Sequence, residues 1–317
     1  MTDVTTRMLD AKDTGINRAA KILRDGGLVA FPTETVYGLG ADARNGHAIA
    51  RIFKAKGRPA FNPLIIHIAT LEMAEQIAVF SDAAMRLAAA FWPGPLTLVL
   101  PLRPDADLSS LVSAGLPTIG IRLPAHPAAQ QLLTAFGGPI AAPSANPSGK
   151  ISPTTAAHVA AGLSGRIDAI LDAGACDVGL ESTIIGFDPA PTLLRSGGLP
   201  HEAIETCLGT RLTIHTTPET PNAPGQLTSH YAPTAPLRLN VKAKRTGELK
   251  LGFGPDDDAD LNLSPSGDLI EAAANLFHHL HKLDAQNAIA IAIAPIPNIG
   301  LGIAINDRLT RAAAPRP

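Results

Sequence analysis

Two cationic side chains stand two residues apart in a short loop whose shape glycine and proline restrict, Lys56-Gly57-Arg58-Pro59. An arginine can bind phosphate oxygens in a bidentate manner, and a lysine can act beside it as a point charge. Charge-assisted hydrogen bonds contribute roughly 1.5–3 kcal/mol each, so two or three of them could anchor a triphosphate. We therefore predict a phosphate-binding role for Lys56 and Arg58, whereas we expect Arg51 and Lys54 to lie on the solvent-exposed face of a short helix.

A second stretch with possible chemistry covers residues 27–42. An apolar strand through Phe31 ends in a proline and in the polar cluster Thr33-Glu34-Thr35, and the glycines Gly38 and Gly40 follow. This composition is typical of a polar pocket at the carboxyl end of a buried strand, where open α/β sheets tend to hold ligands. Together with the cationic loop, it indicates a small polar substrate that meets a phosphorylated one.

Three further side chains lie on predicted strands. Arg122 is near the end of the strand 118–123, and a buried arginine needs an anionic partner, which could be structural or a substrate carboxylate. His67 lies inside the apolar strand 64–68 and, judged alone, is expected to be a core residue whose ring nitrogens are hydrogen-bonded. Arg195 ends the strand 192–195 just before two glycines and is another arginine at a sheet end.

The loop from Pro143 to Lys150 leaves two interpretations open. Its serines and its asparagine could form turns and a helix cap, or they could form a nest of donors beside a phosphate. The sequence has no P-loop, no serine-hydrolase elbow and no complete dinucleotide fingerprint, so a nucleotide must be held by side chains and loops. The histidines at 278, 279 and 281 flank apolar residues, and we expect no metal site there.

The composition sets the class of protein. The chain has 317 residues, of which 45% are hydrophobic and 17% are charged, as is typical of a globular protein rather than a disordered one. The formal net charge of −2 argues against an autonomous nucleic-acid binder. Two cysteines cannot build a disulfide framework, the polar first residues lack a signal-peptide pattern, and no apolar run is long enough to span a membrane. We expect a cytoplasmic protein.

The elements that must position these residues alternate along the first two hundred residues. We predict an α/β domain with a mixed sheet over residues 1–215, because its last strands follow one another too closely for helical crossovers. A proline-rich linker is predicted over 216–236, and a small second α/β unit over 237–317. Predicted helices cover 15–24, 45–53, 125–136, 154–161, 268–283 and 303–311, and predicted strands cover 28–31, 64–68, 96–100, 118–123, 139–142, 167–171, 182–187, 192–195, 237–241, 249–252 and 288–294.

Taken together, these motifs resemble the threonylcarbamoyl-AMP synthase family, whose catalytic domain is of the YrdC type. The resemblance spans roughly residues 10–210, continues into the linker and tail, and corresponds to the long, two-domain form. It implies a YrdC-like mixed twisted sheet with flanking helices, followed by a small Rossmann-like α/β domain. The matching segments are residues 31–40, Lys56-x-Arg58-Pro59, Asn62-Pro63-Leu64, residues 92–97, Arg122-Leu123-Pro124, residues 142–146, Glu181-Ser182-Thr183, residues 223–225, residues 230–233 and residues 300–309.

The resemblance implies a reaction and a set of site residues. L-Threonine, bicarbonate and ATP would give threonylcarbamoyl-AMP and pyrophosphate, for the formation of N6-threonylcarbamoyladenosine in tRNA by a downstream transferase. Residues implied to hold L-threonine are Thr35, His67, Arg122, Ala142 through its backbone, and Ser182. Residues implied to hold ATP are Lys56, Arg58, Asn62, Thr118, Ser144, Asn146, Ser152 and Arg195, with Tyr231 of the linker covering the nucleotide.

The implied chemistry needs no protein nucleophile. The threonine carboxylate would pair with Arg122, and its amine would take up carbon dioxide as a carbamate that attacks the α-phosphorus. Lys56 and Arg58 would offset charge as pyrophosphate leaves, so catalysis would depend on positioning and electrostatics. Mg²⁺ would be carried by the ATP phosphates and water, without a carboxylate cluster.

Two alternatives from other classes remain. The first is a non-catalytic RNA-binding module, against which the net charge and the lack of basic runs argue. The second is a carbamoyl transferase of the kind that serves hydrogenase maturation, which would carry cysteine pairs that this chain lacks. One departure from the family pattern concerns the segment Gly225–Tyr231, where family members often carry lysines and this chain has none.

Overall fold

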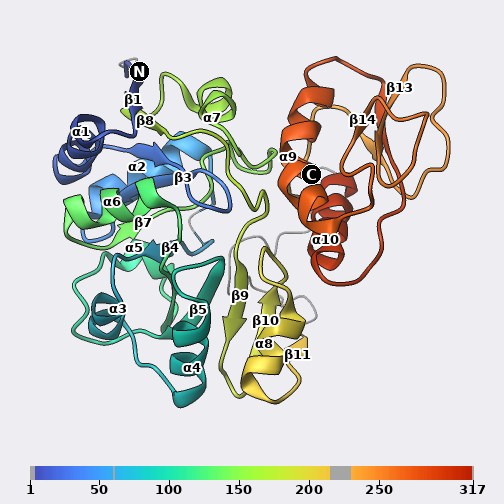
Figure 1. Ribbon diagram of the computed structural model, residues 1–317. Helices are drawn as coiled ribbons and strands as arrows, with labels where there is room; N and C mark the ends of the chain where they lie inside the picture. The colour runs from blue at the N-terminus through green and yellow to red at the C-terminus, as the bar shows by residue number, and fades with distance from the viewer. Residues whose placement is uncertain (1–3, 60, 215–229, 316–317) are drawn as a thin grey trace.

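A long mixed sheet forms the centre of the first domain (Figure 1). The computed structural model describes residues 4–59, 61–214 and 230–315. Within these residues the strands follow the order β1-β8-β2-β3-β7-β4-β6-β5-β9-β10-β11. Their bounds are β1 (Arg7–Asp10), β2 (Val29–Phe31), β3 (Gly38–Asp42), β4 (Ile65–His67), β5 (Leu96–Pro101), β6 (Thr118–Arg122), β7 (Ile140–Ala141), β8 (Ala169–Asp172), β9 (Thr183–Gly186), β10 (Thr192–Arg195) and β11 (Thr213–Ile214).

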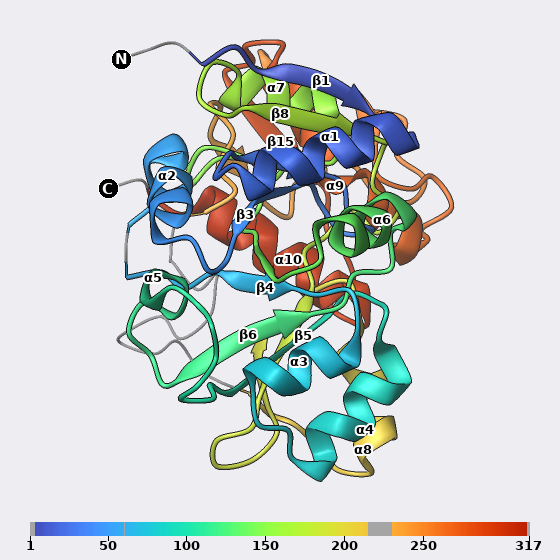
Figure 2. The ribbon, with the colours of Figure 1, turned by 90° about the vertical axis from the view of Figure 1, so that its left-hand side faces the viewer.

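Helices cover this sheet because each of the longer ones presents an apolar stripe to it. In α1 (Asp13–Arg24), Ile16, Ala19, Ala20 and Leu23 are buried, and the helix packs against α6 (Pro127–Phe136) (Figure 2). The C-caps of α2 and α6 are the glycines Gly57 and Gly137, both in the left-handed conformation that glycine adopts most easily. The other helices of this domain are α2 (Gly46–Lys56), α3 (Leu71–Ile77), α4 (Asp82–Phe91), α5 (Ser110–Ser113), α6 (Pro127–Phe136), α7 (Ala156–Leu163) and α8 (His201–Leu208).

A second, smaller sheet is parallel throughout its described strands, which follow the order β12-β15-β13-β14. These strands are β12 (Leu237–Arg238), β13 (Glu248–Gly252), β14 (Leu261–Asn262) and β15 (Ala290–Ile293), and two helices, α9 (Leu269–Asp284) and α10 (Leu301–Ala313), accompany them. Figure 1 shows this unit in orange and red beside the first domain.

The two units share a packed interface. Val36, Ile151 and Leu180 of the first domain belong to the same apolar cluster as the buried face of α9. The ring of His158, on α7, stacks on His281, on α9, with 3.9 Å between ring centroids. At Gly179 an added Cβ would lie 2.4 Å from the backbone oxygen of Ala273, so a side chain has no room there. The backbones of the two domains therefore approach closely.

The prediction of a mixed sheet with flanking helices and a second α/β unit is confirmed. β3 was not predicted, because the residues after Phe31 were interpreted as a pocket loop. In the structure they form the turn of an antiparallel hairpin, with Phe31 opposite Gly38. The elements β1, α3, α4, α5, α8, β11 and β14 were not predicted either. The domain limits 1–215, 216–236 and 237–317 stay predictions, since most of the predicted linker lies outside the described residues. In the described part of the chain, no helix combines the length and apolarity that a membrane span requires.

Candidate active site

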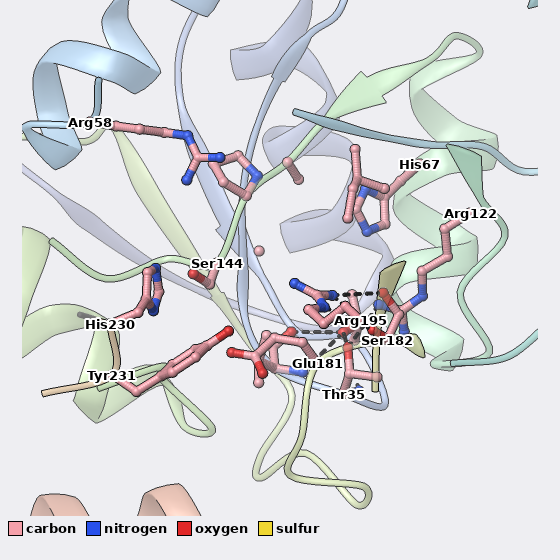
Figure 3. A pocket seen from close by; sticks show the side chains of 16 residues that line it. Thr35, Arg58, His67, Arg122, Ser144, Glu181, Ser182, Arg195, His230 and Tyr231 are labelled. Atoms are coloured by element: carbon pink, nitrogen blue, oxygen red, sulfur yellow. Dashed lines mark hydrogen bonds between the residues drawn. The ribbon is translucent and has the colours of Figure 1, made fainter. Parts of the chain in front are cut away.

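One pocket gathers polar side chains from both ends of the first domain's sequence (Figure 3). It lies where the β2–β3 turn, β4, β6, the loop after β7 and the β9–β10 pair come together, and residues 230 and 231 close it. Its volume is about 50 Å³, room for a few water molecules but not for a nucleotide. Its lining residues are Thr33, Thr35, Val36, Gly38, Arg58, Ile65, His67, Arg122, Ala142, Pro143, Ser144, Glu181, Ser182, Arg195, His230 and Tyr231.

Arg122 is held at one end of this pocket by the β2–β3 turn. Its Nη2 lies 2.7 Å from Glu34 Oε1 in a buried ion pair whose two atoms are not aligned for a hydrogen bond. Its Nη1 donates to Thr35 Oγ1 at 2.8 Å, and its Nε donates to Gly94 O at 3.2 Å. Thr33 Oγ1 lies 2.8 Å from Thr35 Oγ1 and supports the turn. The guanidinium is thus oriented before any ligand arrives, as recognition of a carboxylate requires.

His67 lies beside Arg122 because β4 and β6 pair in parallel with these two residues in register. Burial lowers the pKa of His67 to about 3, and the nearby charge of Arg122 adds to this effect, so the imidazole is neutral. Its Nδ1 has no hydrogen-bond partner among the described residues. Ala142 follows β7 next to it, and its N–H donates to Ile65 O at 2.9 Å. A buried, unpartnered ring nitrogen at a pocket wall suits a ligand better than the core role that the sequence alone suggested.

Two further buried cations line the pocket: Arg58 lies at the end opposite Arg122, and Arg195 lies between the two, beside Ser182 (Figure 3). Arg58 donates to Asn62 O at 3.3 Å and to Pro63 O at 3.0 Å, and burial together with the charge of Arg195 lowers its pKa to about 10. Arg195 is also buried, and burial lowers its pKa as well. Desolvated cations that repel one another indicate a site made for an anion.

Lys56 stands behind this wall rather than on it. The side chain is 3% exposed, and its Nζ donates to Ser144 O at 2.5 Å and to Asn146 O. Burial lowers its pKa well below the usual value, and Arg58 adds to the effect. The loop after β7 is tied back in turn, since Ser148 N donates to Lys56 O at 2.8 Å. Lys56 therefore shapes the loop that presents Ser144.

The β9–β10 pair forms the third wall. Arg195 Nη2 donates to Ser182 O at 2.8 Å and to Ser182 Oγ at 3.1 Å, and Ser182 Oγ lies 2.7 Å from Thr97 Oγ1. Next to them, Ser152 Oγ donates to Glu181 Oε1 at 2.5 Å. These contacts join the start of β9 to the end of β10 in one hydrogen-bonded unit.

Tyr231 covers the pocket from the linker side. Its ring stacks on Phe277 of α9, with 5.6 Å between centroids, and the guanidinium of Arg308 lies 5.1 Å from its centroid. Its φ angle of 63° is uncommon for a residue with a side chain. His230 lies beside it, and its Nδ1 has no hydrogen-bond partner among the described residues. The second domain thus holds the tyrosine in place.

The structure brings most of the predicted site residues to this one pocket. The five that do not line it surround it: Lys56, Asn62, Asn146 and Ser152 are buried beside its walls, and Thr118 lies at a small apolar cavity with Thr97, Val99 and Gly120. Sequence reasoning gave no role to Glu181 and His230, although each is the chain neighbour of a predicted residue. In the described residues no group of three or more His, Cys, Asp or Glu side chains could hold a metal ion.

Direct binding of a magnesium ion by the carboxylate that lines the pocket is disfavoured. Glu181 is the carboxylate that lines the pocket, and both of its oxygens are engaged, one by Ser152 and one by Arg308. A carboxylate so occupied is a poor direct ligand for Mg²⁺, which keeps several waters in sites built around phosphates.

Comparisons with known proteins agree with this picture. A family model for Sua5, YciO and YrdC proteins, described as "Telomere recombination", matches residues 21–197, and a model for the threonylcarbamoyl-AMP synthase C-terminal domain matches residues 199–314. The threonylcarbamoyl-AMP synthase of Bacillus subtilis is 42% identical, over 99% of this chain and 97% of that protein. Its counterpart from Pyrococcus abyssi is 43% identical, over 95% of this chain and 94% of that protein. The crystal structure of Pyrococcus abyssi Sua5 complexed with L-threonine superposes with a TM-score of 0.90 at 40% identity, covering 97% of this chain and 98% of that one.

The two models in this order, together with the two observed sheets, define the class of two-domain proteins in which a YrdC-type domain precedes a smaller α/β domain. Within that class, the chain belongs to the threonylcarbamoyl-AMP synthase family. The resemblance drawn from its motifs is confirmed.

Proposed function

We propose that this protein is a threonylcarbamoyl-AMP synthase, which condenses L-threonine, bicarbonate and ATP to threonylcarbamoyl-AMP and pyrophosphate. The observation that carries the proposal is the arrangement of charge in the pocket: an oriented arginine with neutral donors lies at one end, the buried Arg58 lies at the other, and the buried Arg195 lies between them. The relatives that match the whole chain carry the name of this enzyme, and one of them has been solved with L-threonine.

L-Threonine is assigned to the end formed by Arg122. Its carboxylate would bind the Nη1 and Nη2 groups of the guanidinium, which Thr35 and Glu34 already orient. Thr35, His67, Ser182 and the backbone of Ala142 would then surround its ammonium and hydroxyl groups. The neutral imidazole of His67 is suited to accept a hydrogen bond there, since its Nδ1 is unpartnered among the described residues.

ATP is assigned to the part of the pocket formed by Arg58, Arg195 and Ser144. The arginines would pair with phosphate oxygens, and Lys56, Asn62, Asn146 and Ser152 would hold the loops that carry them. The cavity beside Thr118 has a volume of about 10 Å³, which holds no more than a water molecule, so it would have to open for Thr118 to contact the nucleotide. Mg²⁺ would enter with the phosphates.

The reaction then proceeds by positioning. Bicarbonate releases hydroxide to give carbon dioxide, the neutral threonine amine adds to its carbon, and the proton that the nitrogen then loses combines with the hydroxide to form water, which leaves a carbamate. A carbamate oxygen attacks the α-phosphorus, and the bond from that phosphorus to the bridging oxygen of pyrophosphate breaks. Arg58 and Arg195 stabilise the charge that develops on the leaving group, in a dry site where such contacts are strong. The reaction class is nucleotidyl transfer.

Tyr231 acts in this proposal as a cover that must move for substrates to enter. The closed pocket has a volume of about 50 Å³, far less than a triphosphate nucleotide requires. The linker segment before it, including Gly225–Ser229 with its missing lysines, lies outside the described residues. The product would pass to a transferase that modifies tRNA, without strong binding of nucleic acid by this chain, and we infer a cytoplasmic location from the free cysteines Cys176 and Cys207.

The test is pyrophosphate release by the purified protein with ATP and Mg²⁺, with mass spectrometry of the nucleotide product. Release that requires both threonine and bicarbonate, together with a product of the mass of threonylcarbamoyl-AMP, is expected. Arg58→Ala should abolish it, whereas Arg51→Ala, a matched arginine on α2 that pairs with Asp168, should not. A folded protein that binds RNA but releases no pyrophosphate would support the binding-module alternative instead.

A further inference from the structure

An arginine of the second domain reaches into the wall of the pocket in the first. Arg308 lies on α10, and its side chain is 1% exposed. Arg308 belongs to residues 300–309, which match the family pattern, but neither that resemblance nor the proposed reaction gives Arg308 a role.

The guanidinium of Arg308 contacts two segments of the catalytic domain. Its Nε donates to Glu181 Oε2 at 2.8 Å, and its Nη2 donates to Ser196 O at 2.9 Å. Its Nη1 donates to Asp307 Oδ2 at 2.7 Å, and its plane lies over the ring of Tyr231. One side chain therefore joins α10, β9, β10 and the cover of the pocket.

The two catalytic-domain contacts lie on either side of the Ser182–Arg195 pair. Glu181 directly precedes Ser182, and Ser196 directly follows Arg195. By holding both neighbours, Arg308 fixes the distance between the two strands at the point where Arg195 donates to Ser182. The backbone repeats this connection, since Gly198 N donates to Glu181 O at 2.9 Å.

Arg308 also supplies the positive charge that Glu181 needs. Burial alone would raise the pKa of this carboxyl, but the charges of Arg308 and Arg195 and the hydrogen bond from Ser152 together hold the pKa below its usual value. The titratable and charged groups that face Glu181 are Arg308 and Asp307 on α10, Arg195 on β10, and His230 and Tyr231 of the linker. Without Arg308, the remaining arginine in this set is Arg195, and the carboxylate would pull it away from Ser182 and from a bound phosphate.

We propose that Arg308 is a positioning residue for ATP binding: it neutralises Glu181 and clamps Ser196, and so keeps Arg195, which donates to Ser182, in the geometry that receives the phosphates. This inference rests on the proposed function, and it assigns to the second domain an indirect part in shaping the catalytic pocket. Arg308 acts through its neighbours and does not itself line the pocket.

The test measures ATP affinity by calorimetry in the full-length protein, without threonine or bicarbonate, between pH 6 and pH 8. Arg308→Met should weaken ATP binding by about tenfold or more at pH 8. The difference from the unmodified protein should shrink toward pH 6, because protonation of Glu181 ends its competition for Arg195. The double variant E181Q/R308M, which has no buried carboxylate to neutralise, should recover affinity to within about threefold and lose the pH dependence.

The matched control is Arg238→Met, which removes an arginine–glutamate pair with Glu248 from the same domain, away from the catalytic domain. It should leave ATP affinity unchanged. Unchanged ATP affinity in Arg308→Met, or a loss that is equal at every pH and persists in E181Q/R308M, overturns the proposal, because a merely structural defect behaves in that way.

A second pair of variants covers the case in which Arg308→Met does not fold. Arg308→Lys keeps the charge beside Glu181, whereas Arg308→Gln keeps hydrogen-bond donors without it. The proposal is supported if the ATP affinity of Arg308→Lys does not depend on pH while the ATP affinity of Arg308→Gln does. The proposal is overturned if the ATP affinities of the two variants show the same dependence on pH. Unmodified protein that binds ATP but releases no pyrophosphate refutes the proposed function and leaves this test intact.

Discussion

Replacement of Arg58 by methionine is expected to move stability and ligand binding in opposite directions. Arg58 is buried, and its pKa is lowered from 12.5 to about 10, mainly by burial and further by Arg195. Because one pKa unit corresponds to about 1.4 kcal/mol, the charged guanidinium costs the folded state about 3 kcal/mol relative to the unfolded state at neutral pH. The sign follows from the lowered pKa: below pH 10 the guanidinium is charged in both states and the full cost is present, and the cost disappears as the pH rises from about 10 toward 12.5.

Two hydrogen bonds offset part of this cost. The carbonyls of Asn62 and Pro63 accept from Arg58 at 3.3 and 3.0 Å, and each carbonyl left without a donor costs about 1–3 kcal/mol unless water replaces it. With water replacing the donor at one or both of these carbonyls, we expect Arg58→Met to be between unchanged and about 3 kcal/mol more stable than the unmodified protein. A charge-assisted hydrogen bond from Arg58 to a phosphate oxygen would contribute about 1.5–3 kcal/mol, so ATP should bind the methionine variant about 10 to 150 times more weakly.

Urea unfolding, followed through the fluorescence of the single tryptophan Trp92, measures the first quantity, and calorimetry with ATP measures the second. The matched control is Arg51→Met on the preceding helix, which removes an ion pair to Asp168 at a partly exposed site. This control should lower stability by about 1 kcal/mol or less and leave ATP affinity unchanged. A loss of more than about 2 kcal/mol in Arg58→Met, combined with normal ATP binding, would refute the argument that the buried charge exists for an anion.

Three further outcomes follow from the site. Glu34→Gln should lower the free energy of unfolding by about 3–5 kcal/mol, because it leaves Arg122 buried without its partner; a loss below about 1 kcal/mol in urea unfolding contradicts this. The unfolding free energy should fall as pH drops from 6.5 toward 4, because the unfolded chain protonates His67 while the folded state, with a pKa of about 3, does not. His67→Gln should reduce that slope by up to about 1.4 kcal/mol per pH unit, and an unchanged slope in unfolding measured across this range speaks against a neutral His67. Gly179→Ala should lower the melting temperature and loosen the domain interface, because the φ of 73° and the 2.4 Å distance from an added Cβ to Ala273 O exclude a side chain. An unchanged melting temperature and unchanged limited proteolysis would show that the two backbones can move apart at little cost.

Local patterns predicted many of the elements. The stripe Ile16, Ala19, Ala20 and Leu23 placed α1, and the apolar runs around residues 65–67 and 118–122 placed β4 and β6. β3 was not predicted because Gly38 and Gly40 have a low strand propensity. In the structure Gly40 packs so closely on Phe31 and Ile140 that a Cβ would lie under 3 Å from both. Packing against neighbours, which the sequence does not show, made this segment a strand.

The candidate site could likewise be predicted only in part from the sequence. Lys56, Arg58, Arg122 and Arg195 drew attention because a charge in a loop or at a strand end needs a partner. His67 alone looked like core, and only its pairing in register with Arg122 places it at the pocket. Arg308 could not be assigned from local sequence at all, since it meets Glu181 across 127 residues of chain and a domain boundary. Side chains that act through tertiary contacts of this length leave no periodic or motif signal.

The same separation has a consequence for the protein during its synthesis. A ribosome adds roughly 5–20 residues per second, so Arg308 emerges about 6–25 s after Glu181. During that interval the catalytic domain can form its sheet, but the carboxylate of Glu181 has no partner on α10 and the cover at Tyr231 has neither Phe277 nor Arg308 to rest on. The nascent first domain would therefore bind nucleotide poorly until the second domain docks, which delays consumption of ATP until the chain is assembled.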